Sequence, residues 1–228
     1  MKLKFLLFAT LVFCLSLPLY PQKKFKVVID AGHGGNNLGA LFGDIAEKDL
    51  TLNLVLKLKS LFDKNKEVEV VFTRTKDVDL SAKNRVEIIE QVKPDMFISL
   101  HFNSQKFLTT NRGFEIYYPP DEIGKSSEEM IKKYDRANNS FYYGTLFKEM
   151  FFKANFHTMW KLPFNLFTQM RGLYMFDETT VPGLLLEIAY LSSPEDRACI
   201  ENPEFTKDIA KYIYDVVLEI KKHSKSSF

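Results

Sequence analysis

The sequence predicts an α/β fold built on a single twisted, mostly parallel sheet with helices on both faces. Two observations favour this class. Short apolar runs typical of buried strands alternate along the chain with segments whose apolar residues recur at helical spacing. In addition, 228 residues with 46% hydrophobic content are enough for one substantial core, and no repeat or long linker marks off a second compact unit.

Six runs are expected to form the strands of this sheet, because they are short, apolar and rich in β-branched and aromatic residues. They are Lys26–Asp30, Val68–Thr73, Met96–Leu100, Gly113–Tyr118, Gly172–Phe176 and Gly183–Tyr190. In a parallel α/β sheet, ligands bind at the carboxyl ends of the strands. Polar residues that follow or end these runs are therefore the candidates for a functional site.

Helices are expected between the strands. The first is marked by leucines that form one stripe at helical spacing, at Leu50, Leu54, Leu58 and Leu61. Ser81 is a suitable N-cap for a second helix. A third is expected over Asn139–Ala154, and an amphipathic C-terminal helix is expected to begin at Pro203.

The N-terminal segment is expected to direct export rather than to join the fold. Residues 1–22 carry two lysines followed by an apolar run, Phe5–Leu17, that has the length of a signal-peptide core and is short for a membrane span. The alternative is an uncleaved anchor, since no small-x-small cleavage pattern precedes Pro21. Residues 23–228 then form the main domain, located in the periplasm or cell envelope.

Charge and cysteine content argue against nucleic-acid binding and against an intrachain disulfide. Without residues 1–22 the chain loses two lysines and no acid, so its formal net charge falls from +2 to zero. A neutral domain argues against nucleic acid as a partner, because bulk positive charge dominates such binding. Only Cys199 remains, so no intrachain disulfide can form, and Cys199 is expected to be a small buried residue.

Two histidines and two glutamates lie beside the predicted strand ends. His33 follows the first strand in "VVIDAGHGG", and His101 ends the third in "MFISLHFNS". Glu187 lies inside the apolar run "GLLLEIAYLS", where a carboxylate is costly unless it is paired or close to a cation. Glu47 begins the first helix. Each has a simpler alternative: the glycines form a turn, a lone histidine is structural, and "DIAE" has the spacing of a capping box.

Together these four residues match a catalytic metal site. Two imidazoles and one carboxylate are a ligand set for catalytic zinc, with a position left for water. Bound zinc lowers the pKa of that water toward ~7. A further carboxylate can then act as general base, and Glu187 suits this role because an apolar environment raises the pKa of a carboxyl group.

At these residues the sequence resembles the zinc-dependent N-acetylmuramoyl-L-alanine amidases of bacterial cell-wall turnover. The resemblance covers most of 26–220, and its elements are "VVIDAGHGG", "AEKDLTLNLVLKLK", "SLHFNS", "RGFEIYY" and "PGLLLEIAYLSSPEDRACI". It implies one zinc ion held by His33, Glu47 and His101, with Glu187 as catalytic base. It also implies the substrate: the peptidoglycan amide between N-acetylmuramic acid and L-alanine of the stem peptide.

Further expectations are less specific. Asp30 is a candidate to hold an imidazole in the right tautomer, and Asn103 to orient substrate or a ligand; a structural role is the alternative for each. Around 119–170 the match is weak and a variable insert is expected. Some members of the family carry a helix there that blocks the metal until an activator protein binds, so an activator is a hypothesis for this chain. We expect a monomer.

Two other functions compete with the amidase interpretation. A zinc peptidase or deacetylase on the same scaffold would use the same chemistry of amide hydrolysis. A non-catalytic wall-binding or regulatory homologue would have lost a ligand or the base, whereas all four residues are present here.

Overall fold

The computed structural model describes residues 24–105, 110–121 and 126–224. The predicted export segment, 1–22, lies outside these residues. Among the helices described, none combines the length and the apolar character that a bilayer-spanning segment needs.

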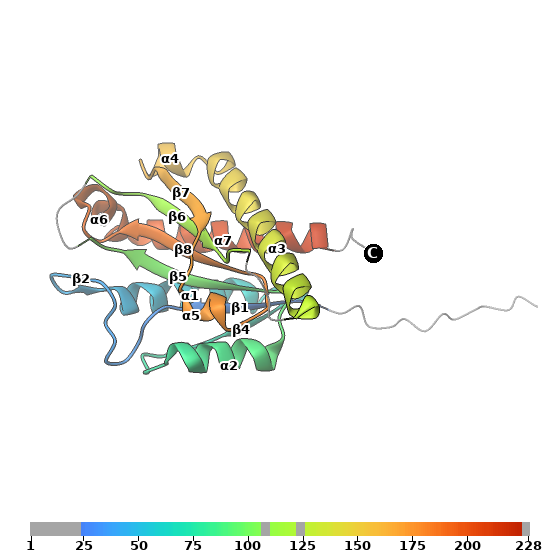
Figure 1. Ribbon diagram of the computed structural model, residues 1–228. Helices are drawn as coiled ribbons and strands as arrows, with labels where there is room; N and C mark the ends of the chain where they lie inside the picture. The colour runs from blue at the N-terminus through green and yellow to red at the C-terminus, as the bar shows by residue number, and fades with distance from the viewer. Residues whose placement is uncertain (1–23, 106–109, 122–125, 225–228) are drawn as a thin grey trace, which may run out of the picture.

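A six-stranded sheet forms the centre of the molecule (Figure 1). Its strands, in spatial order, are β4 (Val68–Phe72), β1 (Phe25–Ala31), β5 (Met96–Asn103), β8 (Gly183–Tyr190), β6 (Phe114–Tyr118) and β7 (Phe164–Gln169). The first four are parallel, β6 is antiparallel to β8, and β7 is parallel to β6. A small hairpin, β2 (Leu41–Phe42) and β3 (Ile45–Ala46), leads into the first helix. The mostly parallel α/β class is therefore confirmed.

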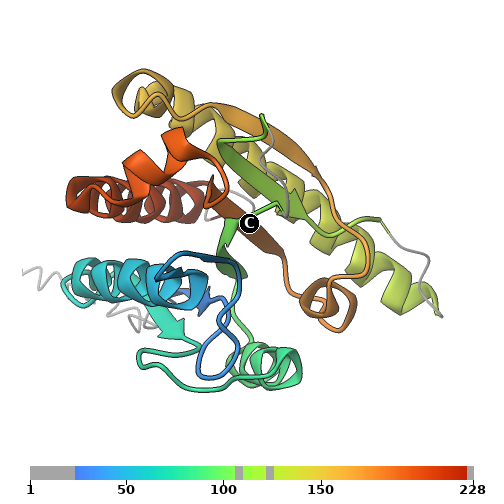
Figure 2. The same cartoon turned by 90° about the vertical axis from the view of Figure 1, so that its left-hand side faces the viewer.

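Helices cover both faces of the sheet, and Figure 2 views them from the end at which the parallel strands finish. One face packs against α1 (Glu47–Phe62), α3 (Ser127–Lys153) and α7 (Pro203–Ser224). The other packs against α2 (Ala82–Val92) and the single turn α5 (Tyr174–Asp177). Two short helices, α4 (Phe156–Met159) and α6 (Pro194–Ile200), complete the chain.

Strand alternation decides which side chains share the α2 face. Successive side chains of a strand point to opposite faces. Val28 of β1, Phe97 of β5 and Leu185 of β8 pack with α2 and α5, while their sequence neighbours enter the larger core under α1 and α7. Asp30, Ser99 and Glu187, two positions further along these strands, therefore belong to the α2 face as well. Near the carboxyl ends those positions are polar.

Two predicted elements differ from the structure and one strand was missed. The prediction of a strand at Gly172–Phe176 is wrong, because Gly172 has φ +74° and the chain then forms α5. The strand in this region is β7, Phe164–Gln169, at the edge of the sheet. The helix predicted over Asn139–Ala154 begins earlier, at Ser127.

Candidate metal centre

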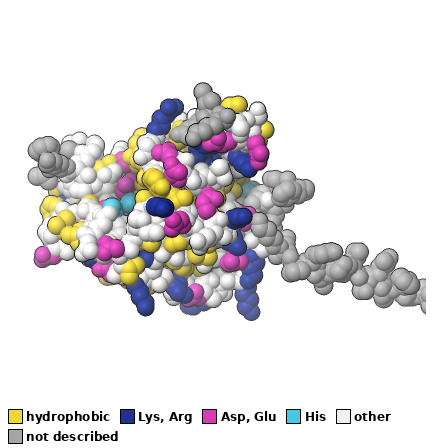
Figure 3. Space-filling model, turned by 60° about the horizontal axis from the view of Figure 1, so that its bottom comes forward, with side chains coloured by type: hydrophobic (Ala, Val, Ile, Leu, Met, Phe, Trp, Pro, Cys, Tyr) yellow, Lys and Arg dark blue, Asp and Glu magenta, His cyan; other side chains and the backbone are white. Residues whose placement is uncertain are grey.

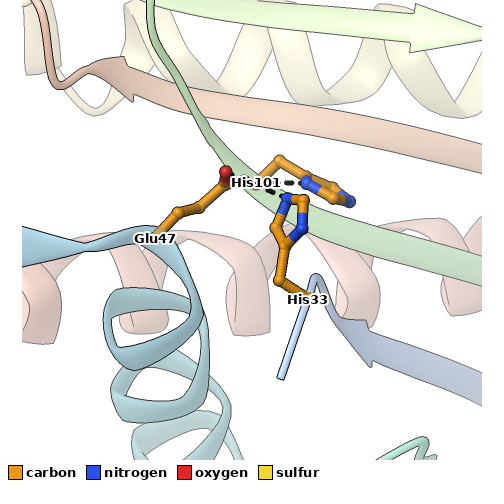
Figure 4. A group of neighbouring side chains, drawn as sticks. All are labelled: His33, Glu47 and His101. Atoms are coloured by element: carbon orange, nitrogen blue, oxygen red, sulfur yellow. Dashed lines mark hydrogen bonds and ion pairs between the residues drawn. The ribbon is translucent and has the colours of Figure 1, made fainter. Parts of the chain in front are cut away.

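Three side chains from different elements meet at the carboxyl end of the sheet (Figure 4). His33 follows β1, Glu47 is the first residue of α1, and His101 lies near the end of β5. His33 Nε2 is 3.0 Å from Glu47 Oε2, and His101 Nδ1 is 2.8 Å from Glu47 Oε1. One donor atom from each residue lies within 4.8 Å of the others, so the group can surround a single ion. These are the three residues that the sequence singled out as ligands.

Glu47 is held by backbone donors and does not form a capping box. The N-cap of α1 is Ala46, with no side-chain cap. Glu47 Oε2 accepts a hydrogen bond from Ala40 N (2.8 Å) and Oε1 accepts one from Phe102 N (3.0 Å). The two imidazoles, against the opposing effect of burial, lower the pKa of Glu47 well below its usual range. Glu47 is therefore a fixed carboxylate, ionised at neutral pH.

Both imidazoles direct one nitrogen toward Glu47 and have the other engaged elsewhere. His33 Nδ1 is 3.0 Å from Asn37 Oδ1, and His101 Nε2 is 3.1 Å from Ser99 Oγ. Burial alone would lower the pKa of His101, but the hydrogen bond to Glu47 and nearby acids raise it overall. The side chains of His33 and His101 remain about one-fifth exposed, and on the face turned forward in Figure 3 histidines reach the surface beside acidic groups. A ligand can therefore reach them from solvent.

The glycine-rich loop holds His33 in a backbone conformation that only glycine adopts freely. Its φ is +59°, in the left-handed region that costs other residues roughly 1–2 kcal/mol. Acids and a cation from the segment after β4 fix the loop. Arg74 donates to Gly32 O (2.8 Å), Asp77 accepts from Gly35 N (2.7 Å) and Asp79 accepts from Asn36 N (2.8 Å). The sequence analysis did not identify these anchors.

Two glycines touch the group directly. A Cβ on Gly32 would lie 2.4 Å from the His101 ring, and a Cβ on Gly39 would lie 2.5 Å from both Glu47 Oε2 and His33 Cδ2. The glycines of this region are therefore needed for close approach as well as for the turn.

Glu187 lies beside the group on β8, where it pairs with His101 in the strand register. Its Oε2 is enclosed and has no hydrogen-bond partner among the described residues. Burial raises the pKa of Glu187 to about 7; His101 opposes this, and the charges of Glu47 and Glu115 add to it. An orphaned carboxylate oxygen with this pKa can take up and release a proton near neutral pH.

Glu115, on the other side of Glu187, is a site residue that the sequence analysis missed. It pairs with Glu187 in the β6–β8 register and accepts four hydrogen bonds. Its donors are Asn103 Nδ2 (3.0 Å), Tyr117 OH (2.8 Å), Asn165 Nδ2 (2.5 Å) and Tyr190 OH (2.6 Å). The candidate Asn103 thus belongs to this network. Strand alternation was the available signal, since Glu115 and Tyr117 share the face of Glu187.

The donor set fits a zinc ion. Two nitrogens and a carboxylate oxygen converge, and the orphaned Oε2 of Glu187 lies outside this set, as a general base would. Asp30, expected to hold an imidazole, does not bond to one directly: it accepts a hydrogen bond from Ser99 Oγ (2.7 Å), which in turn contacts His101.

Comparisons with known proteins identify the family. Residues 27–219 match the family model described as N-acetylmuramoyl-L-alanine amidase. A germination-specific N-acetylmuramoyl-L-alanine amidase of Bacillus subtilis is 25% identical over 218 residues, which cover 89% of this chain and 81% of that protein.

Two solved structures extend the comparison. The catalytic domain of the amidase CwlV from Bacillus (Paenibacillus) polymyxa is 31% identical, with a TM-score of 0.69 over 86% of this chain and 97% of that one. The CwlD amidase of Clostridioides difficile, solved in complex with the GerS lipoprotein, shares the fold, with a TM-score of 0.72, 23% identity and coverage of 86% and 98%. The extent of the family match, together with the amidase fold, shows that this chain belongs to the N-acetylmuramoyl-L-alanine amidase family.

Proposed function

We propose that the protein cleaves peptidoglycan at the amide between N-acetylmuramic acid and L-alanine, using zinc held by His33, Glu47 and His101 and Glu187 as general base. The observation that carries the proposal is the convergence of three metal donors next to an enclosed carboxylate oxygen without a partner. The family and its named amidases supply the substrate.

Each residue has a distinct part in this mechanism. When bound, zinc supplies Lewis acidity, which activates water near neutral pH and polarises a carbonyl group. Glu187 Oε2 accepts the proton of the attacking water and returns it to the leaving L-alanine nitrogen. Glu47 contributes a fixed negative charge to the ligand set, and its two backbone donors keep it in place.

Digestion of purified peptidoglycan, with products identified by mass spectrometry, tests the reaction. Release of peptides with a free L-alanine amino terminus supports the proposal. Cleavage between two amino acids, or release of acetate, would instead assign the site to a peptidase or deacetylase. Binding of sacculi with no product at full zinc occupancy would favour a non-catalytic homologue.

Glu187→Gln is the control for the base. It removes the proton acceptor while keeping the size of the side chain, so the variant should bind one zinc ion per chain and release no peptide. Turnover by this variant at the wild-type rate would remove Glu187 from the base role.

We further propose export through residues 1–22, action in the cell envelope as a monomer, and residues 119–170 as a variable insert of the catalytic domain 23–228. The CwlD–GerS complex supports an activator as a partner, because it shows one amidase of this fold bound to a lipoprotein. The metal group lies at the carboxyl end of the parallel strands, whereas α3 begins at the other end of the sheet in Figure 1, so the first turns of α3 lie away from the group. An activator would therefore act by another route than displacing these turns.

A further inference from the structure

A buried polar network lies directly behind the two histidines. Asp30 of β1 and Ser99 of β5 face each other in the strand register, and both are fully buried. Ser99 Oγ donates to Asp30 Oδ2 (2.7 Å), and His101 Nε2 lies 3.1 Å from the same Ser99 oxygen. The network therefore reaches from β1 through β5 to one of the proposed ligands.

The cation of this network contacts the His33 segment and, through Asp30, is linked to Ser99. Arg85 of α2 donates through Nη1 to Asp30 Oδ1 and to Ala31 O (2.7 Å), and through Nη2 to His33 O (2.6 Å). The N–H groups of a planar guanidinium can donate to these three acceptors at once, whereas the ammonium group of a lysine does not have this fixed planar arrangement of donors. Arg85 thus connects the backbone of His33 with the carboxylate that holds Ser99.

Counting protons places one proton on His101 Nε2. Asp30 is paired with a permanently charged arginine and acts only as an acceptor. Ser99 has a single hydroxyl proton, which it gives to Asp30, so its oxygen can only accept from His101 Nε2–H. The remaining ring nitrogen of His101, Nδ1, faces the Glu47 carboxylate (2.8 Å) and donates to it in the metal-free protein. A metal ion bound at Nδ1 replaces that proton and leaves the proton on Nε2.

We propose that Ser99, Asp30 and Arg85 are positioning residues that keep His101 Nε2 protonated and thereby leave its Nδ1 free to bind the metal. This inference rests on the proposed function, because it assumes that His101 is a ligand. Partners of this kind typically contribute 10–100-fold to metal affinity.

Thr73 provides a matched control. Its hydroxyl also donates to Asp30, at Oδ1 (2.6 Å), but it has no contact with His101 in the hydrogen-bond network. Ser99→Ala and Thr73→Val each remove one hydroxyl from the same carboxylate, and Thr73→Val preserves the shape of the side chain. Only Ser99→Ala should affect the tautomer.

Zinc affinity, measured by competition with a chromophoric chelator, and nitrogen–proton NMR of the histidine rings test the proposal. In the zinc-loaded wild type, His101 should carry its proton on Nε2. Ser99→Ala should weaken zinc binding roughly 10–100-fold, and Thr73→Val should weaken it less than about threefold by comparison.

The outcomes separate the two proposals. A wild type that binds no zinc would overturn the proposed function. A wild type that binds zinc with His101 protonated on Nδ1, or a Ser99→Ala variant with unchanged affinity, would overturn the positioning role alone. Equal losses in Ser99→Ala and Thr73→Val would also contradict it, since they would trace the effect to Asp30 and not to the tautomer. The wild-type NMR result stands even if a variant does not fold.

Discussion

Gly39→Ala, compared with Gly43→Ala, isolates the steric demand of the metal group. Both glycines have positive φ, +66° and +57°, so alanine costs each backbone a similar amount, roughly 1–2 kcal/mol. A Cβ on Gly43 meets nothing within 4 Å. A Cβ on Gly39 would lie 2.5 Å from Glu47 Oε2 and from His33 Cδ2.

The clash at Gly39 is larger than a zinc site tolerates. Real Cβ contacts are essentially never below 3.0 Å, so an approach of 2.5 Å must open by at least about 0.5 Å. Ligand distances in metal sites keep to about ±0.2 Å of their ideal values. We therefore expect Gly39→Ala to lose at least tenfold in zinc affinity, whereas Gly43→Ala keeps the wild-type affinity.

Two measurements on each variant are sufficient. Urea denaturation of the metal-free proteins gives the backbone cost in Gly43→Ala and the backbone cost plus steric strain in Gly39→Ala, so Gly39→Ala should be the less stable variant. Chelator competition gives the zinc dissociation constant of each. The same zinc affinity in Gly39→Ala and Gly43→Ala would refute the reasoning, because the two variants would then differ in a contact with no effect on the site.

Three more predictions follow from the site. Because the pKa of Glu187 in the folded protein, about 7, exceeds its ordinary 4.5, the stability that this group contributes is complete below about pH 4.5 and lost as pH rises through 7. In urea denaturation of the metal-free proteins, the free energy of unfolding of Glu187→Gln should therefore be about 3 kcal/mol higher than that of the wild type at pH 8 and equal to it at pH 4. Equal free energies of unfolding at both pH values would contradict this. Glu115→Gln replaces one acceptor oxygen with an NH2 group that faces hydrogen-bond donors, so it should lower the free energy of unfolding by about 1–3 kcal/mol, against about 1 kcal/mol for Tyr117→Phe. The reverse order in thermal denaturation would argue against a four-donor network. His101→Ala should lower zinc content, measured by elemental analysis, more than tenfold, while His157→Ala, at an exposed position outside the site, should leave it unchanged.

Much of the fold follows from local patterns in the sequence. The leucine stripe of α1, the Ser81 cap of α2 and the start of α7 at Pro203 are all confirmed. Each depends on neighbours within a few residues, which a sequence displays directly. The apolar runs of β1, β5 and β8 are equally clear because both of their faces are buried.

The elements that were wrong or missed depend on tertiary contacts. The edge strand β7 is largely exposed and lacks the continuous apolar pattern of a central strand. The first turns of α3 are polar on most sides, so hydrophobic spacing did not reveal them. Ser126, which caps α3 by accepting a hydrogen bond from Glu129 N, was the available signal.

The candidate site shows the same division. His33, Glu47, His101 and Glu187 could be recognised because their residue types are unusual beside strand ends or inside an apolar run. Among their supporting partners Asp30 was a candidate, but Ser99 and Arg85 were not, because a buried serine or arginine has many structural uses. The alternation of strand faces would have grouped Ser99 with His101, but only the strand register brings Asp30 to Ser99.

Anomalous X-ray diffraction at the zinc edge, from crystals of the zinc-loaded protein, tests the central claim most directly. The account predicts one strong peak bonded to His33 Nε2, a Glu47 oxygen and His101 Nδ1 at about 2.0–2.2 Å. A peak bonded to other residues, or no peak at this position in a protein that binds zinc in solution, would contradict it.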